Sequence, residues 1–169
     1  MEYSILLTGF QGTSAEKLVK SVCGCDTLLL PSNKQADADL LTRQLLRRKY
    51  DLIISIGQRP NIKDKVHIET LAREKDTALK TAVDCEKLAQ CFDAAGIPAK
   101  LSSNAGLSYC NTLYFNGLQL LSTYNLTAGM VFIHIPFEKN ISEPDLFYKR
   151  FQNVIDEMKR KGAEHIWRS

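Results

Sequence analysis

The sequence contains no apolar run long enough to span a bilayer, and no segment typical of a secretory signal precedes its first apolar stretch. It also lacks a strong excess of charge, because 22 lysines and arginines against 19 aspartates and glutamates leave a net charge of +3. The basic residues are scattered along the chain rather than gathered in one patch. We therefore expect a cytoplasmic protein that binds neither nucleic acid nor a membrane.

The five cysteines show no pattern typical of a disulfide framework or a zinc site. An odd number of cysteines without a secretory signal indicates free thiols in a reducing compartment. Cys23 and Cys25 are separated by a single residue, whereas common zinc motifs separate their ligands by about two to four and carry a second Cys or His pair. We expect no metal and no cofactor.

Apolar runs that read as strands alternate with amphipathic stretches that read as helices along nearly the whole chain. The expected strands are 3–8, 27–30, 52–56, 66–72, 99–103 and 130–133. The expected helices are 15–22, 34–49, 82–94, 111–123 and 142–161. With 169 residues, 44% of them hydrophobic, and no repeat or linker, this order predicts a three-layer α/β/α sandwich in one domain, residues 1–169, around a mainly parallel, mixed central sheet.

Two details of this prediction depend on periodicity. In the helix expected over 34–49, the helical spacing predicts a core stripe of Ala36, Leu40, Leu41, Leu45 and Leu46. In the strand expected over 66–72, a period of two places His67, Glu69 and Leu71 on one face.

The turn after the first strand, Gly9-Phe10-Gln11-Gly12, offers weak support for a nucleotide site. A phosphate-binding loop needs Lys-Ser or Lys-Thr after its last glycine, and the dinucleotide motif needs three glycines; neither is present. The turn nevertheless places Phe10 at the carboxyl end of a strand, where open α/β sheets bind their ligands.

The main candidate for chemistry is Cys110, which follows a small-residue turn and opens an apolar helix. Backbone N–H groups and the positive end of a helix favour the thiolate over the thiol. A lone cysteine is, however, more often a small buried hydrophobe. Its position alone leaves both interpretations open.

A cysteine nucleophile needs an imidazole to take its proton and an acceptor to orient that imidazole. Of the three histidines, His134 follows an apolar strand and precedes Ile135-Pro136. His67 lies next to a polar loop, and His165 lies in the C-terminal tail, where we expect it to be exposed. Glu69 is the carboxylate near a strand end. Spacing alone does not show that Cys110, His134 and Glu69 meet.

These residues resemble the motifs of pyroglutamyl peptidase type I, also called pyrrolidone-carboxylate peptidase. The cysteine motif is similar to Asn104-Ala105-Gly106 with Cys110-Asn111, and the histidine motif to Phe132-Ile133-His134-Ile135-Pro136. Leu7-Thr8-Gly9-Phe10 resembles the first motif of the family, and Ile56-Gly57-Gln58 followed by Ile68-Glu69 resembles its Gly-Gln and Glu motifs. The matches run in family order along essentially the whole chain.

The resemblance implies a cysteine exopeptidase that removes an N-terminal pyroglutamyl residue from peptides through a thioester, without metal or cofactor. Cys110 would be the nucleophile, His134 the general base and then acid, and Glu69 the group that orients the imidazole. Phe10 would pack on the pyrrolidone ring, and Gln58 would stand at the substrate pocket. The resemblance also implies a homo-oligomer, a dimer or tetramer.

The chain departs from the family around the pocket rather than at the three catalytic candidates. The Pro-Phe-Gly-Gly and Asn-Pro segments, which carry a second aromatic residue, are replaced by Gln11-Gly12-Thr13-Ser14. An Asp-Ala-Arg run, whose arginine lies near the active cysteine in the family, has Leu79 in its place, followed by Lys80. The loop after that run is missing, and Ser108 replaces an aromatic residue, with Tyr109 one place along. A non-catalytic relative that binds a lactam or a peptide N-terminus is therefore the alternative.

Overall fold

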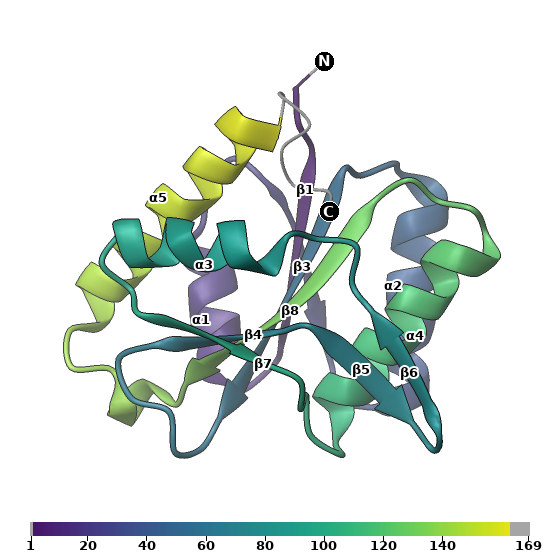
Figure 1. Cartoon of the computed structure of the whole chain (residues 1–169), viewed down its shortest axis with the longest axis horizontal. Helices are drawn as coiled ribbons and strands as arrows, with labels where there is room; N and C mark the ends of the chain where they lie inside the picture. Colours follow the sequence, from purple (N-terminus) through teal and green to yellow (C-terminus); the bar gives the residue numbers. More distant parts are fainter. Residues whose placement is uncertain (1, 163–169) are drawn as a thin grey trace.

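The computed structural model describes residues 2–162 as a six-stranded sheet with helices on both faces (Figure 1). The strands of the sheet are β1 (Ile5–Phe10), β2 (Asp26–Leu30), β3 (Leu52–Arg59), β4 (Val66–Glu69), β7 (Ala99–Ser102) and β8 (Gly129–Pro136). A separate two-stranded hairpin consists of β5 (Leu71–Glu74) and β6 (Thr77–Lys80). The helices are α1 (Ser14–Ser21), α2 (Lys34–Arg47), α3 (Cys85–Ala94), α4 (Tyr109–Thr123) and α5 (Pro144–Gly162), with a short 3₁₀ turn, η1 (Glu138–Asn140).

The sheet has the order β2-β1-β3-β8-β4-β7. Strands β2, β1, β3 and β8 are parallel to one another, and β4 pairs with β8 in the antiparallel sense and with β7 in the parallel sense. The predicted α/β/α sandwich around a mainly parallel, mixed sheet is confirmed. The sense of β4 was not predictable from the order of elements, because a loop rather than a helix leads from β3 into β4.

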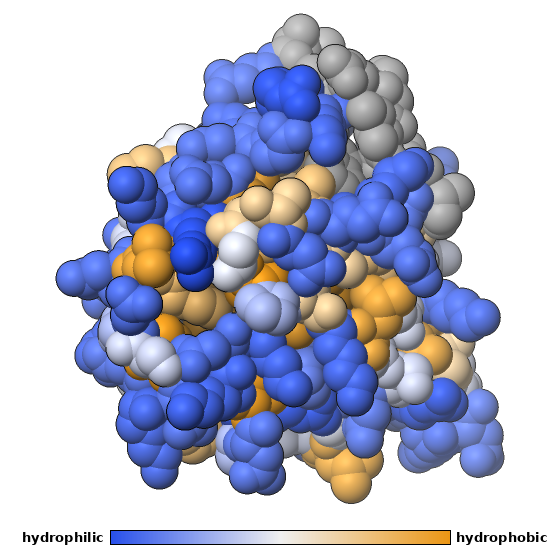
Figure 2. Space-filling model, turned by 60° about the vertical axis from the view of Figure 1, so that its left-hand side comes forward, coloured by the Kyte–Doolittle hydropathy of each residue, from blue (hydrophilic) through white to orange (hydrophobic). Residues whose placement is uncertain are grey.

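Each face of the sheet has its own hydrophobic cluster, because successive side chains of a strand point to opposite faces. On one face, Ile54, Ile133 and the other apolar residues of the same phase pack against α1, α3 and α5. On the other face, Ile53, Phe132 and their neighbours pack against α2 and α4. The surface on the side of α3 and α5 is mostly hydrophilic, with separate small hydrophobic areas (Figure 2).

Two periodicity predictions fail in part. Leu46 is 53% exposed, and Asp37 of the same helix is 1% exposed, so the buried stripe of α2 includes a carboxylate. The expected strand 66–72 is interrupted at Thr70, whose N–H and hydroxyl both donate to Ser102 O. His67 and Glu69 share a face of β4 as predicted, whereas Leu71 belongs to the β5–β6 hairpin.

In the described part of the chain, no helix combines the length and the apolarity needed to cross a membrane.

Candidate active site

Cys110 lies in the first turn of α4, where the loop after β7 enters the helix. The loop turns at Gly106, whose φ of +89° requires a glycine, and the N–H of Gly106 donates to Asn104 Oδ1 at 3.0 Å. Helix α4 begins at Tyr109, one residue before the thiol. The sequence predicted this placement of Cys110 at a helix start to within one turn.

Three hydrogen bonds hold the first turn of α4 against β4 and the β5–β6 hairpin. Arg73 N donates to Asn111 Oδ1 at 3.0 Å, and Asn111 Nδ2 donates to Arg73 O at 2.7 Å. One turn further on, the hydroxyl of Tyr114 donates to Glu69 O at 2.9 Å. The residue after the thiol is therefore fixed by its side chain, and Cys110 has little freedom to move relative to β4.

The sulfur of Cys110 lies directly over the backbone of Gly57 in β3. A Cβ atom placed on Gly57 would come within 2.6 Å of Cys110 Sγ and 2.9 Å of Phe132 Cζ, so only a glycine leaves room for the thiol. Gly57 is the register partner of His134 in the adjacent parallel strand β8. The structure thus brings the thiol over one strand and the imidazole onto the next, on the same face of the sheet.

His134 and Glu69 form a buried hydrogen-bonded pair. His134 Nδ1 lies 2.8 Å from Glu69 Oε1, and the side chains are 4% and 0% exposed. The ring of His134 also packs against Phe132, with the two ring centroids 4.9 Å apart. A buried carboxylate on Nδ1 holds the ring and its tautomer in place and leaves Nε2 for a proton exchange.

Sequence reasoning missed Arg59, the last residue of β3. Its Nη1 lies 3.1 Å from Glu69 Oε1, so one carboxylate oxygen contacts both the arginine and His134. Its Nη2 donates to Asn104 O at 2.6 Å. The predicted strand ended at Ile56, which placed Arg59 in a loop; extending the alternation of β3 past Gly57 puts Arg59 on the Cys110 face.

Burial raises the pKa of the Cys110 thiol to about 12. The Arg59 guanidinium and the backbone N–H of Cys110 itself oppose this shift, whereas the carboxylates of Glu69 and Asp37 reinforce it. Burial therefore works against the thiolate that the helix start favours. A thiol that reacts as a nucleophile then needs a base to take its proton.

The two predicted substrate-binding residues lie in different surroundings. Phe10 is 4% exposed and belongs to the same hydrophobic cluster that Cys110 packs against. Gln58 alternates with Gly57 and Arg59 along β3, and its Oε1 accepts a hydrogen bond from Ser14 N at the start of α1, at 3.0 Å. The structure thus groups Phe10 with the thiol, and Gln58 with the first turn of α1.

Of the two other histidines, the structure describes only His67, which makes no hydrogen bond to Glu69 or His134 within the described residues. His67 is the antiparallel register partner of His134, and its two ring nitrogens are buried without a hydrogen-bond partner in the part of the chain that the structure describes. Burial and the nearby Arg59 guanidinium lower the pKa of His67, which favours the neutral ring. His165 lies outside the described residues.

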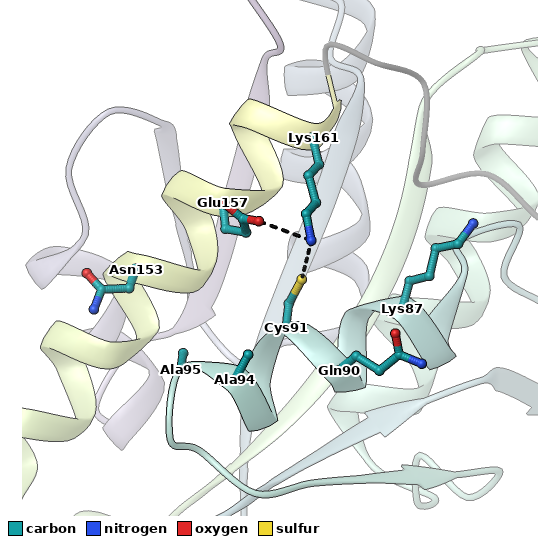
Figure 3. Close-up of a pocket in the computed structure, with 8 residues that line it drawn as sticks. All are labelled: Lys87, Gln90, Cys91, Ala94, Ala95, Asn153, Glu157 and Lys161. Atoms are coloured by element: carbon teal, nitrogen blue, oxygen red, sulfur yellow. Dashed lines mark hydrogen bonds and ion pairs between the residues drawn. The ribbon is translucent and has the colours of Figure 1, made fainter.

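A cavity of about 660 Å³ lies between α3 and α5, away from Cys110 (Figure 3). It is lined in part by Cys91, Glu157 and Lys161; Lys161 Nζ is 3.0 Å from Glu157 Oε1 and 4.0 Å from Cys91 Sγ. Burial raises the pKa of Cys91 even though the lysine ammonium opposes the shift. Among the described residues that line this cavity there is no histidine, so none of them supplies an imidazole base for Cys91.

Within residues 2–162, no three His, Cys, Asp or Glu side chains are arranged to hold a metal ion.

Comparisons with known proteins find similar sequences and folds. A family model for pyroglutamyl peptidase matches residues 63–146, which include Glu69, Cys110 and His134. A pyrrolidone-carboxylate peptidase from Alkaliphilus oremlandii is 28% identical over 79% of this chain and 78% of its own length. Another, from Thermococcus kodakarensis, is 25% identical over 95% of this chain and 92% of its own length.

Solved structures show the same fold. Pyroglutamyl peptidase I from Bacillus amyloliquefaciens superimposes with a TM-score of 0.81 at 20% identity, covering 91% of this chain and 93% of that one. Pyrrolidone carboxyl peptidase from Fervidobacterium islandicum gives a TM-score of 0.80 at 22% identity, with 94% and 99% covered. The chain therefore matches the pyroglutamyl peptidase family model over residues 63–146 and shares the fold of solved pyroglutamyl peptidases, which supports a cysteine omega peptidase.

Proposed function

We propose that this chain is itself a cysteine exopeptidase that hydrolyses the bond after an N-terminal pyroglutamyl residue through a thioester. Its substrate is an N-terminally pyroglutamylated peptide. The observation that supports this most strongly is the buried 2.8 Å contact between His134 Nδ1 and Glu69 Oε1 on the face over which the Cys110 sulfur lies. A nucleophile, a base and a group that orients the base are the parts that such a reaction needs.

The reaction begins with the neutral thiol, since burial raises the pKa of Cys110 to about 12. His134 Nε2 takes the proton as the sulfur attacks the exocyclic carbonyl carbon of the pyroglutamyl residue. The C–N bond then breaks, and the imidazolium gives its proton to the departing amine. The N–H groups in the first turn of α4 are available to the oxyanion that forms on the carbonyl.

The second half of the reaction restores the thiol. His134 removes a proton from a water molecule, which attacks the thioester carbon as the C–S bond breaks. The sulfur leaves as a thiolate and takes the proton back from the imidazolium. The products are free pyroglutamate and the shortened peptide, and no metal, cofactor or redox partner takes part.

The pocket for the lactam is expected around Phe10, because a neutral five-membered ring suits an aromatic wall. Phe10 is 4% exposed, so the ring of the substrate must displace neighbouring side chains to reach it. This enclosure, and the protonated thiol, favour the second candidate function, a relative that binds a lactam or a peptide N-terminus without cleaving it.

Hydrolysis of a pyroglutamyl reporter amide distinguishes these functions. We expect wild type to release the reporter, and Cys110→Ala to lose the activity by roughly a million-fold, since removal of a nucleophile leaves only residual catalysis. Cys91→Ala is the matched control, because Cys91 is a free thiol like Cys110 but lies at the α3–α5 cavity; it should keep wild-type activity. Equal rates in wild type and Cys110→Ala would refute the proposal. Reporter binding without hydrolysis by wild type would establish the binding function.

Two further expectations belong to this proposal. Assembly into a dimer or tetramer and a cytoplasmic location remain predictions, and sedimentation of the purified chain would test the first.

A further inference from the structure

Arg59 holds together the two halves of the site. Through Nη1 it contacts Glu69 Oε1 at 3.1 Å, and Glu69 in turn holds His134. Through Nη2 it donates to Asn104 O at 2.6 Å, in the loop that leads into Cys110. The guanidinium therefore makes hydrogen bonds both to the loop before Cys110 and to the carboxylate that holds His134.

The geometry requires an arginine. A guanidinium presents several N–H donors in a rigid planar fork, so two of its nitrogens can bind two different acceptors at once. A lysine ammonium keeps the positive charge but is a compact point charge on a flexible stem. Charge and two-point attachment can therefore be separated by substitution at this position.

Arg59 also brings a positive charge to the site. Among the described residues, the Arg59 guanidinium favours the Cys110 thiolate, whereas the carboxylates of Glu69 and Asp37 disfavour it. Its side chain is 23% exposed, so its field is only partly screened by water. Lys80, next to the Leu79 that replaces the family arginine, is an exposed residue of the β5–β6 hairpin.

We propose that Arg59 is a positioning residue that ties the Asn104 loop of the nucleophile to the Glu69–His134 pair and supplies the positive charge that supports the Cys110 thiolate. The kinetic test of this proposal rests on the proposed function, whereas the alkylation test does not. Arg59 lies outside the residues that carry the family resemblance, and it acts through the nucleophile and its base rather than by forming a bond to substrate.

The kinetic test compares Arg59→Met and Arg59→Lys with wild type on a pyroglutamyl reporter amide. For Arg59→Met we expect kcat to fall by about 100-fold with KM changed less than about threefold, because misplacement of reacting groups costs about that much. The acid limb of its kcat/KM profile should move to higher pH by about half to one unit, since removing a nearby cation disfavours proton loss from the Cys110–His134 pair. Arg59→Lys should lose about 10-fold in kcat and keep the wild-type acid limb, because the charge remains and the two-point attachment does not.

Alkylation of Cys110 by chloroacetamide at pH 9 gives a readout that does not depend on peptidase activity. Peptide mass mapping should show Cys110 labelled several-fold more slowly in Arg59→Met than in wild type and Arg59→Lys. The exposed thiol of Cys23 serves as the internal standard, and Arg43→Met, an exposed arginine of α2, is the control for loss of one cation.

Three outcomes would overturn the proposal. One is an Arg59→Met variant whose KM rises while kcat stays the same, which would make Arg59 a substrate-binding group. The second is a loss of activity with an unchanged acid limb and unchanged Cys110 labelling, which would indicate a purely structural role. The third is equal activity in all the variants. If wild type releases no reporter, the proposed function fails, and the Cys110 labelling still decides the role of Arg59.

Discussion

The two faces of the central sheet differ in what they bury. The face covered by α1, α3 and α5 packs almost only apolar side chains, from Ile54, Ile133 and their neighbours of the same phase. The face covered by α2 and α4 buries Thr8, Asp37, Ser55, Glu69 and His134. The same strands thus supply a hydrophobic core on one side and a polar site on the other.

Because of this difference, we expect the two faces to contribute differently to stability and to activity. Burying a polar group without a partner costs free energy, and several atoms on the polar face have none within the described residues. These atoms are both carboxylate oxygens of Asp37, both ring nitrogens of His67, and Glu69 Oε2. Proteins keep such groups where function requires them. Substitutions at the site on the polar face, such as those of Glu69 and Gly57, should therefore change activity, and substitutions on the apolar face should change stability.

The largest effect is expected from Glu69→Gln. The amide keeps the size of the carboxylate but removes the charge that holds His134 in its tautomer, so kcat/KM should fall about 10³- to 10⁴-fold. Reporter kinetics on the folded variant measure this loss. Glu74→Gln, an exposed glutamate of β5, is the control. Wild-type kinetics in Glu69→Gln would mean that the buried pair is only structural.

Gly57→Ala should reduce activity by about 100-fold, because its Cβ would lie 2.6 Å from Cys110 Sγ and would displace the thiol. Gly117→Ala is a control in the same helix as Cys110, about two turns further on. Its Cβ would lie 2.3 Å from Met130 Sδ, a flexible side chain of β8. That variant should lose stability and keep its kcat/KM. Similar kinetics in the two variants would contradict the placement of Cys110 over β3.

Ile155→Val tests the apolar face. Ile155 is fully buried in α5, so loss of one methyl group should lower the free energy of unfolding by about 0.5–1.5 kcal/mol and lower the Tm by a few degrees. Denaturant unfolding measures the first value, and kcat/KM should stay unchanged. A large change in kcat/KM would show that the two faces are coupled.

Asp37→Asn should have the smallest effect on Tm, and the size of this effect should depend on pH. Burial raises the pKa of Asp37 above its ordinary 3.8, so the folded state binds the proton more tightly than the unfolded state does. Ionisation of Asp37 therefore lowers stability as the pH rises from about 3.8 through the raised folded pKa. We expect Asp37→Asn to raise the Tm by about 2–4 °C at pH 7 and to have no such effect below pH 3.8. Thermal unfolding across this range checks it; an increase in Tm that does not depend on pH would contradict it.

Much of this organisation was predictable from the sequence. The alternation of strands and helices predicted the layers, and the motifs around Cys110, His134 and Glu69 identified the residues that the structure groups together. The pair of His134 and Glu69 could be predicted because His134 follows an apolar strand and Glu69 lies near the end of another. The thiol was placed correctly at the start of α4.

What escaped prediction depends on long-range packing. Arg59 contacts Glu69 only because β4 runs antiparallel to β8, and nothing local sets that direction. Asp37 is buried in the otherwise apolar stripe of α2, whereas helical periodicity predicted that Leu46 would be buried. The pKa of Cys110 depends on how deeply the sulfur is buried, which the position of a residue in a helix does not reveal.

The central claim is that Cys110 is the nucleophile of a site on the polar face. Inactivation by a pyroglutamyl chloromethyl ketone tests it most directly, because the attacking sulfur displaces chloride and keeps the label. We predict that activity is lost in step with one equivalent of label, and that peptide mass mapping finds this label on Cys110, with Cys23 and Cys91 unmodified. Loss of activity with Cys110 unmodified, or full activity with Cys110 labelled, would contradict the claim.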